Sequence, residues 1–214
     1  MRRCLLEFVL IVLAVWAWPL PALAASPEED RPVVVFLGDS LTAGFGLAKD
    51  RAFPALVGER LDEAGLPARV VNAGVSGDTS AGGLRRLDWV LRQRPDVLVV
   101  ALGGNDGLRA LPVERLEANL VDIVREAREA GARVLLLGVR MPPSHGKAYK
   151  ESFEAVYPRV ARELDVPLVP YMLEGVAGDP ALNLPDGIHP TAEGHRVIAD
   201  NVFPAVAELV KSVQ

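Results

Sequence analysis

Short apolar runs alternate with segments of helical spacing along most of the chain. Five runs are rich in valine and leucine, which predicts strands that are buried on both faces. These runs cover residues 33–37, 69–72, 97–102, 134–139 and 166–169. In the intervening segments, and after the last run, apolar residues recur every three or four positions, which predicts amphipathic helices. The helices are expected at residues 53–64, 79–94, 113–130, 149–164 and 191–213.

The order of these elements predicts the class of fold. Fully apolar strands that alternate with helices are typical of a parallel sheet with helices on both sides. The chain has no internal repeat and no linker that would divide two cores, so we expect one α/β domain. Pro158 and Pro204 fall inside predicted helices and are expected to bend them.

The first thirty residues have a different pattern. Two arginines precede an uncharged apolar run at residues 8–20, and Ala22-Leu23-Ala24 follows as a small-x-small sequence. This arrangement predicts a signal peptide that is cleaved after Ala24. An uncleaved membrane anchor is the alternative, but a spanning helix needs about 20 apolar residues. We therefore expect a signal peptide at residues 1–24, a flexible lead-in at 25–32, a domain at 33–214 and an exported, periplasmic or secreted protein without a stable membrane anchor.

Composition narrows the possible functions. The 214 residues carry a formal net charge of −5, are 24% charged and 50% hydrophobic, and include one cysteine, Cys4. An acidic chain without a basic run is a poor candidate for binding nucleic acid. A single cysteine excludes an internal disulfide and a cysteine-based zinc site. No histidine pair has the spacing of metal ligands, so we expect no metal and no cofactor.

Four polar, glycine-rich segments follow strands or precede the last helix. They are residues 38–44, 74–79, 103–107 and 186–190. In open parallel sheets the functional site lies beyond the carboxyl ends of the strands, so these segments are expected to meet there. Ser40 lies at a turn from strand to helix, and a serine nucleophile needs a base. His189 is the candidate base, and Asp186 could accept a hydrogen bond from its Nδ1–H.

The same segments supply donors for an oxyanion. The backbone N–H groups of Ser40 and Gly77 and the side-chain amide of Asn105 are the candidates. Each segment has an ordinary alternative, because Gly-Asp-Ser is a common turn, Asp-x-x-His-Pro could cap a helix and residues 103–107 could form a tight turn. Their combination favours catalysis. Ser76 is a rival nucleophile, but it lacks the G-x-S-x-G pattern.

The two other histidines have simpler interpretations. We expect His145, in a proline-rich loop, to lie at the surface, and His195 to be a solvated residue of the last helix.

These motifs resemble those of the SGNH hydrolases, also called GDSL lipases and esterases. The four family residues match Ser40, Gly77, Asn105 and His189, and residues 71–73, 76–80, 102–109 and 165–168 are similar to the group of exported bacterial thioesterases, lysophospholipases and arylesterases within that family. The resemblance implies a flavodoxin-like, three-layer α/β/α sandwich with sheet order 2-1-3-4-5. It also implies hydrolysis of small-molecule acyl esters and thioesters, such as acyl-CoA and lysophospholipid, through an acyl-enzyme.

Apolar residues near the four motifs suggest where an acyl chain would bind. The candidates are Leu108, Leu111, Met141, Pro142 and Leu184. A carbohydrate O-deacetylase on the same fold remains an alternative function, as does a binding module without activity, although the intact catalytic residues argue against the latter. A flavodoxin-like cofactor binder lacks support, because the third glycine of a dinucleotide motif is absent. We expect a monomer.

Overall fold

The computed structural model describes residues 31–141 and 143–214. The predicted signal peptide, most of the predicted lead-in and Pro142 lie outside the described residues.

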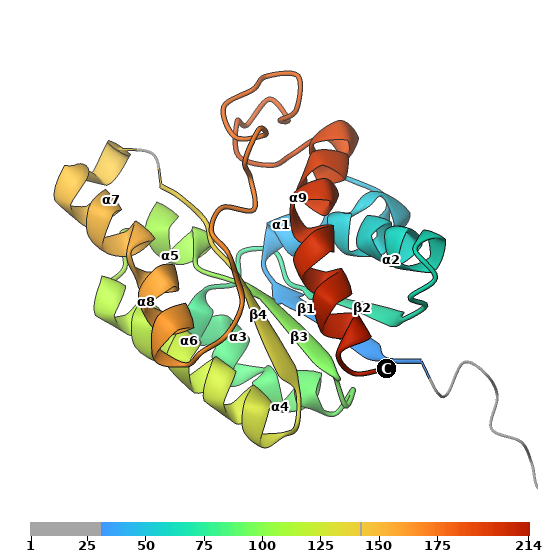
Figure 1. Ribbon diagram of the computed structural model, residues 1–214. Coiled ribbons are helices and arrows are strands. Elements are labelled where there is room, and N and C mark those ends of the chain that lie inside the picture. Colours follow the sequence, from blue (N-terminus) through green and yellow to red (C-terminus); the bar gives the residue numbers. More distant parts are fainter. Residues whose placement is uncertain (1–30, 142) are drawn as a thin grey trace, which may run out of the picture. The chain divides into compact units, whose positions relative to one another are not determined.

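Five parallel strands form one sheet in the order β2-β1-β3-β4-β5, and Figure 1 labels β1 to β4. The strands are β1 (Val33–Gly38), β2 (Arg69–Gly74), β3 (Val97–Ala101), β4 (Arg133–Leu137) and β5 (Leu168–Val169). The register pairs Gly38 of β1 with Gly74 of β2 and with Ala101 of β3, so these three strands end level with one another. The segments that follow them therefore leave the sheet side by side. The predicted parallel sheet and its strand order are confirmed.

Helices cover both faces of the sheet (Figure 1). On one side α2 packs against α9, which contacts β3, β4 and β5, and on the other side α6 packs against α3, α8 and β4. The α-helices are α1 (Ser40–Ala43), α2 (Phe53–Glu63), α3 (Ser80–Arg85), α4 (Leu87–Leu91), α5 (Gly104–Leu108), α6 (Val113–Glu129), α7 (Lys147–Glu154), α8 (Val156–Glu163) and α9 (Ala192–Lys211). Two short 3₁₀ helices are η1 (Lys49–Arg51) and η2 (Pro143–His145). Among the described residues, no helix combines the length and the apolar character that a membrane crossing requires.

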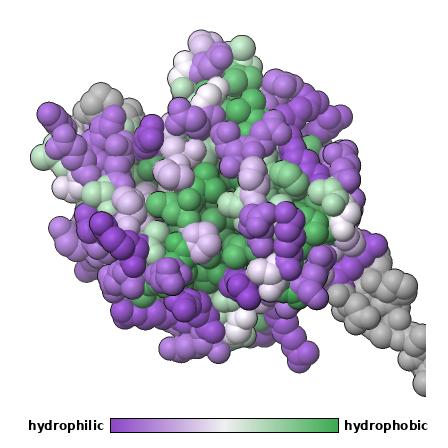
Figure 2. Space-filling model, viewed as in Figure 1, coloured by the Kyte–Doolittle hydropathy of each residue, from purple (hydrophilic) through white to green (hydrophobic). Residues whose placement is uncertain are grey.

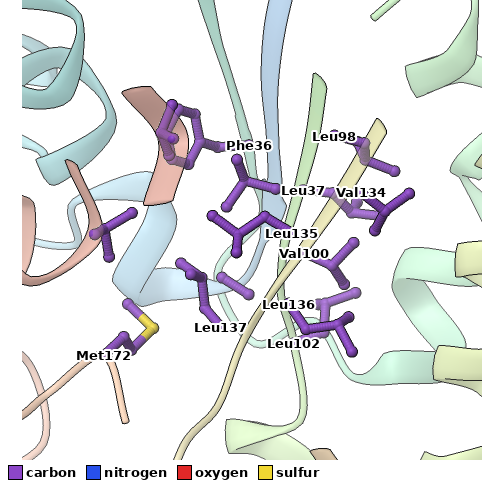
Figure 3. Packing of buried hydrophobic residues seen from close by; sticks show 14 of the residues in the cluster. Phe36, Leu37, Leu98, Val100, Leu102, Val134, Leu135, Leu136, Leu137 and Met172 are labelled. Carbon is purple, nitrogen blue, oxygen red and sulfur yellow. The ribbon is translucent and has the colours of Figure 1, made fainter. Parts of the chain in front are cut away.

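The core lies between the sheet and these two helix layers. Leu37, Val100 and Leu135 are fully or almost fully buried and come from three neighbouring strands (Figure 3). At one side of this cluster Phe36 meets Phe53 edge to face, with ring centroids 5.5 Å apart. On the face seen in Figure 2, hydrophobic residues gather where β4 lies in Figure 1, and hydrophilic residues surround them. The runs of β1, β3 and β4 are thus core strands, as expected from their composition, whereas β2 and β5, at the two edges of the sheet, are only partly buried.

Two predicted helices are each divided into two. The helix expected at 79–94 is interrupted at Arg86, whose side chain turns inward to bind Asp78 and the carbonyl oxygen of Gly38. The helix expected at 149–164 is interrupted at Ala155 rather than at Pro158. Pro158 is the third residue of α8, a position whose backbone N–H has no acceptor within the helix, so proline fits there without a bend.

Candidate active site

The first strand delivers Ser40 to the edge of the sheet. Asp39 caps α1, because its Oδ1 accepts a hydrogen bond from the Leu41 N–H at 3.0 Å. Ser40 is the first residue of this four-residue helix, which ends at Gly44 with a φ of 73°. A Cβ at Gly44 would lie 2.7 Å from the Cβ of Ala52, and the positive φ favours glycine independently. The turn is thereby restricted to a conformation that presents the Ser40 side chain beyond β1.

Ser40, His189 and Asp186 form one chain of hydrogen bonds. His189 Nε2 lies 2.9 Å from Ser40 Oγ, and His189 Nδ1 lies 2.7 Å from Asp186 Oδ2. The other carboxylate oxygen of Asp186 accepts the N–H groups of Ile188, at 2.9 Å, and His189, at 3.0 Å. These bonds from His189 and Ile188 lower the pKa of Asp186 to about 2, so the carboxylate is ionised at neutral pH. An ionised carboxylate only accepts, so Nδ1 carries the proton and Nε2 can accept from the Ser40 hydroxyl.

A long loop after β5 holds Asp186 and His189 in place. The Leu184 N–H donates to the carbonyl oxygen of His189 at 2.7 Å, which closes a turn around Asp186. The buried Asn183 donates to the carbonyl oxygens of Val176 and Asp179, at 2.6 and 2.8 Å. These bonds give the loop a fixed conformation although it contains no strand or helix that pairs with the sheet.

The three expected oxyanion donors come from the ends of β1, β2 and β3. Gly77 lies in the turn after β2 with a φ of 80°, and Asn105 is the second residue of α5. Asn105 Nδ2 donates to the carbonyl oxygen of Asp78 at 2.9 Å and lies 3.4 Å from Asp39 Oδ2. Within residues 31–141 and 143–214, neither the Ser40 N–H nor the Gly77 N–H donates to another protein group. Both are therefore available to a ligand.

Asp39 is a buried carboxyl group beside this site. Its exposed fraction is 3%. Burial raises the pKa of Asp39 to about 6, although the hydrogen bond from Leu41, the proximity of His189 and the Asn105 amide oppose this shift.

A cavity of about 380 Å³ opens beside Ser40, Asn105 and His189. Its wall is largely apolar. The apolar and aromatic residues of the lining are Leu41, Leu108, Val139, Met141, Tyr171, Leu173, Ala177 and Ile188. Leu108 and Met141 were expected here from the sequence. Ile188, which is 46% exposed, was not, although its position next to His189 could have indicated it.

Two of the expected groove residues lie elsewhere. Leu111 is not part of the described lining. Its N–H donates to the carbonyl oxygen of Asp106, and its own carbonyl oxygen accepts from the Tyr149 hydroxyl. Leu184 lines a neighbouring hollow of about 340 Å³ that does not include Ser40. The fifth candidate, Pro142, lies outside the described residues.

The expectation that His195 is solvated is wrong. Its exposed fraction is 1%, and its Nδ1 accepts a hydrogen bond from the Phe53 N–H at 3.1 Å. The residue before α2 is Ala52, which has no side chain that could cap the helix, so His195 supplies the missing acceptor. Burial lowers the pKa of His195 to about 4, and His189 adds to this shift. His145 is exposed, as expected.

The rival nucleophile and possible metal ligands were the other candidates from the sequence. Ser76 is exposed in the turn after β2, and among the described residues it forms no hydrogen bond with a histidine. The described residues also include no group of three or more His, Cys, Asp or Glu side chains arranged to hold a metal ion.

A serine, histidine and aspartate linked by hydrogen bonds at the carboxyl edge of a parallel sheet, beside free N–H donors, define the class of serine hydrolases that act on acyl groups. Comparison with known proteins specifies the family. The model of the GDSL-like lipase/acylhydrolase family matches residues 36–197, and the chain belongs to that family. It is a hydrolase of esters and thioesters, and the resemblance inferred from its motifs is confirmed.

Characterised relatives cover most of the chain. It is 43% identical to esterase TesA of Pseudomonas aeruginosa over 178 residues, which are 83% of this chain and 89% of the relative. It is 40% identical to thioesterase 1/protease 1/lysophospholipase L1 of Escherichia coli over 201 residues, 92% of this chain and 95% of the relative. A crystal structure of TesA matches the fold with a TM-score of 0.80 at 43% identity and covers 83% of this chain and 99% of that one.

Proposed function

We propose that the protein hydrolyses carboxylic esters and thioesters of medium-length acyl chains, with Ser40 as nucleophile, His189 as general base and acid, and Asp186 as the residue that orients His189. The observation that carries this proposal is the unbroken hydrogen-bond chain from Asp186 through His189 to Ser40, at 2.7 and 2.9 Å, next to an apolar cavity.

The proposed reaction follows from the protonation states. Ser40 Oγ attacks the acyl carbonyl carbon while its proton passes to His189 Nε2. The Ser40 and Gly77 N–H groups bind the oxyanion of the tetrahedral intermediate, together with the Asn105 amide hydrogen that faces Asp39 Oδ2 at 3.4 Å in the resting site. His189 then protonates the departing alcohol or thiol, which leaves an acyl ester on Ser40. Water, deprotonated by His189, attacks this ester, and His189 then returns the proton to Ser40 Oγ as the bond to the acyl group breaks and the acid is released.

The cavity supports acyl chains as substrates. Each CH₂ group that leaves water contributes about 0.8 kcal/mol, so a largely apolar wall favours a chain over an acetyl group. Leu108 and Ile188 are 43% and 46% exposed at this wall, where an entering chain would cover them. A carbohydrate O-deacetylase is the second candidate. It would need an extended polar surface for the sugar, which the largely apolar wall disfavours.

Export is part of the proposal and rests on the sequence of residues 1–24 alone. The mature protein would begin at Ala25 and contain no cysteine. Mass spectrometry of the protein recovered from the periplasm or medium of an expressing bacterium is expected to give the mass of a chain that starts at Ala25. A full-length chain retained in the membrane fraction would refute cleavage.

Activity is best tested with p-nitrophenyl esters from acetate to palmitate, alongside acyl-CoA and lysophospholipid. Ser40→Ala and His189→Ala are each expected to lower kcat by a factor on the order of 10⁶, as in other serine hydrolases with this arrangement. Ser76→Ala is the matched control, because Ser76 is an exposed serine in a neighbouring turn, and it should retain activity. Full activity of Ser40→Ala would refute the proposed nucleophile. Preference for acetyl esters, with release of acetate from acetylated polysaccharide, would favour the deacetylase.

A further inference from the structure

Phe45 occupies a fixed position just after the helix that carries Ser40. Its N–H donates to the carbonyl oxygen of Ser40 at 3.0 Å, and Gly44 before it has a φ of 73°. The next bond of the turn, from Leu47 N–H to the Gly44 carbonyl oxygen, is also 3.0 Å long. The backbone of Phe45 is therefore tied directly to the residue that we propose as nucleophile.

The side chain of Phe45 covers a face of the His189 imidazole. The two ring centroids are 4.3 Å apart and the planes are inclined by 32°. Both edges of the imidazole are already occupied, because Nε2 meets Ser40 and Nδ1 meets Asp186. His189 lies far along the chain from α1, and the segment from α1 to Phe45 contacts its ring in two ways, through the Ser40 hydroxyl and through the Phe45 ring.

The contact with Phe45 is separate from the acyl cavity. Phe45 is not among the described residues that line the cavity, whereas Leu108, Ile188 and His189 are. The Phe45 side chain is 47% exposed, but the His189 side chain beneath it is only 18% exposed. A large apolar residue that stays half in water contributes little to the core. Packing in the core therefore does not explain the position of Phe45, whereas its contact with His189 does.

The physical effect of an aromatic ring on an imidazole depends on the charge of the imidazole. The face of a phenyl ring carries partial negative charge, which attracts a cation within about 6 Å of the ring centroid. In the proposed reaction His189 is positively charged only while a proton is in transit between Ser40 and the leaving group or water. An aromatic ring at this distance therefore stabilises the charged intermediate more than the resting state.

We propose that Phe45 is a positioning residue that holds the His189 imidazole between Ser40 and Asp186 and stabilises its protonated form during acyl transfer. This inference rests on the proposed function, in particular on the roles of Ser40 and His189. In this proposal the residues that follow β1 both present the nucleophile, Ser40, and position the base, His189.

The test compares variants that separate the aromatic face from apolar bulk. Phe45→Leu keeps an apolar side chain without a ring face, and Phe45→Tyr keeps the ring. We expect Phe45→Leu and Phe45→Ala to lower kcat about fivefold to tenfold, a factor typical of aromatic and cation–π contacts. KM and the preference for acyl-chain length should remain unchanged, and Phe45→Tyr should keep kcat within about twofold of the wild type, since its ring face is equivalent. Trp89→Ala is the matched control, because Trp89 is an aromatic residue of similar exposure, 51%, on α4.

A spectroscopic measurement identifies the contact independently of turnover. The ring current of Phe45 should move the carbon-bound protons of the His189 imidazole upfield in NMR spectra. These signals should move downfield in Phe45→Leu and stay in place in Phe45→Tyr and Trp89→Ala. Circular dichroism confirms that each variant is folded, and Phe45→Leu serves as the test if Phe45→Ala does not fold.

The possible results distinguish the role of Phe45 from the proposed function. Wild-type kcat in Phe45→Leu, with an inactive Ser40→Ala, would overturn the role of Phe45 and leave the proposed function intact. A higher KM at unchanged kcat would also overturn it, because Phe45 would then bind substrate. An active Ser40→Ala would refute the proposed function itself and, with it, the inference. A fall in kcat alone, rescued by Tyr, would support the role of Phe45.

Discussion

Substituting His195 by Asn removes a buried imidazole and should change how stability depends on pH. The folded-state pKa of His195 is about 4, below its ordinary value of 6.5. Between these values the unfolded chain binds a proton at His195 and the folded chain does not, so the free energy of unfolding decreases as pH falls. For a single group, the free energy of unfolding changes by at most about 1.4 kcal/mol per pH unit. His195 therefore lowers the free energy of unfolding by about 3 kcal/mol as pH falls from 6.5 to 4.

Asp39 acts in the same pH range with the opposite sign. Its folded-state pKa is about 6, above the ordinary value of 3.8. Between these values the folded chain binds a proton at Asp39 and the unfolded chain does not, so the free energy of unfolding increases as pH falls, again by about 3 kcal/mol. In the wild-type protein the contributions of His195 and Asp39 nearly cancel between pH 4 and 6.

When either residue is substituted, this cancellation is lost, and the remaining residue should dominate the pH dependence of the free energy of unfolding. Urea unfolding of wild type and His195→Asn, followed by circular dichroism from pH 4 to 7 at constant ionic strength, gives the difference in stability at each pH. Asn keeps an oxygen acceptor for the Phe53 N–H, and lost packing should cost about 1–2 kcal/mol at pH 7. Relative to wild type, His195→Asn should gain about 3 kcal/mol as pH falls from 7 to 4.

The opposite variant and a control complete this experiment. Asp39→Asn should lose stability relative to wild type over the range from pH 6 to 4, because it lacks the carboxyl group that takes up a proton on folding. His145→Asn controls for the loss of an exposed histidine. A difference between His195→Asn and wild type that stays constant from pH 4 to 7 would refute the buried, neutral state of His195.

The remaining predictions concern the site. Asn105→Ala should lower kcat by about 10²–10³ with little change in KM, because the amide binds the oxyanion more strongly than the substrate carbonyl, and a pure KM effect would contradict this role. In the wild type kcat/KM should rise more than about tenfold from acetyl to medium-chain esters. Leu108→Asp should remove this rise but spare acetyl esters, and an unchanged chain-length profile would exclude Leu108 from the groove. EDTA should leave activity unchanged, because the described residues offer no metal cluster, and a loss reversed by a divalent cation would refute this.

The sequence was most informative where one physical requirement dominated. Strands buried on both faces must be apolar along their whole length, so the pattern of valine and leucine predicted the central strands β1, β3 and β4 directly. The edge strands β2 and β5 were predicted from shorter apolar runs and are only partly buried. The rule that parallel strands end at the site selected Ser40 and Asn105, and the need of a serine nucleophile for a base selected His189. The structure brings these three residues to one cavity.

Features that depend on long-range contacts could not be predicted in this way. His195 lies between the exposed residues Glu193 and Arg196 in the sequence, and its burial depends on α9 packing against the start of α2, more than a hundred residues earlier. The interruption at Arg86 depends on partners at Gly38 and Asp78. Leu184 is close to Asp186 in sequence, but the turn that closes at His189 places it beside a different hollow.

The hydrogen bond between Ser40 and His189 joins residues separated by 149 positions, nearly the whole length of the domain. The proposed nucleophile is therefore among the first residues of the domain to be synthesised, whereas the proposed base is synthesised late. A nascent chain that has not yet reached residue 189 contains the serine without its partner and cannot hydrolyse esters by this mechanism. Under the proposed mechanism, hydrolysis of a chromogenic ester therefore reports only those folded chains that extend beyond residue 189, even in a preparation that also contains shorter ones.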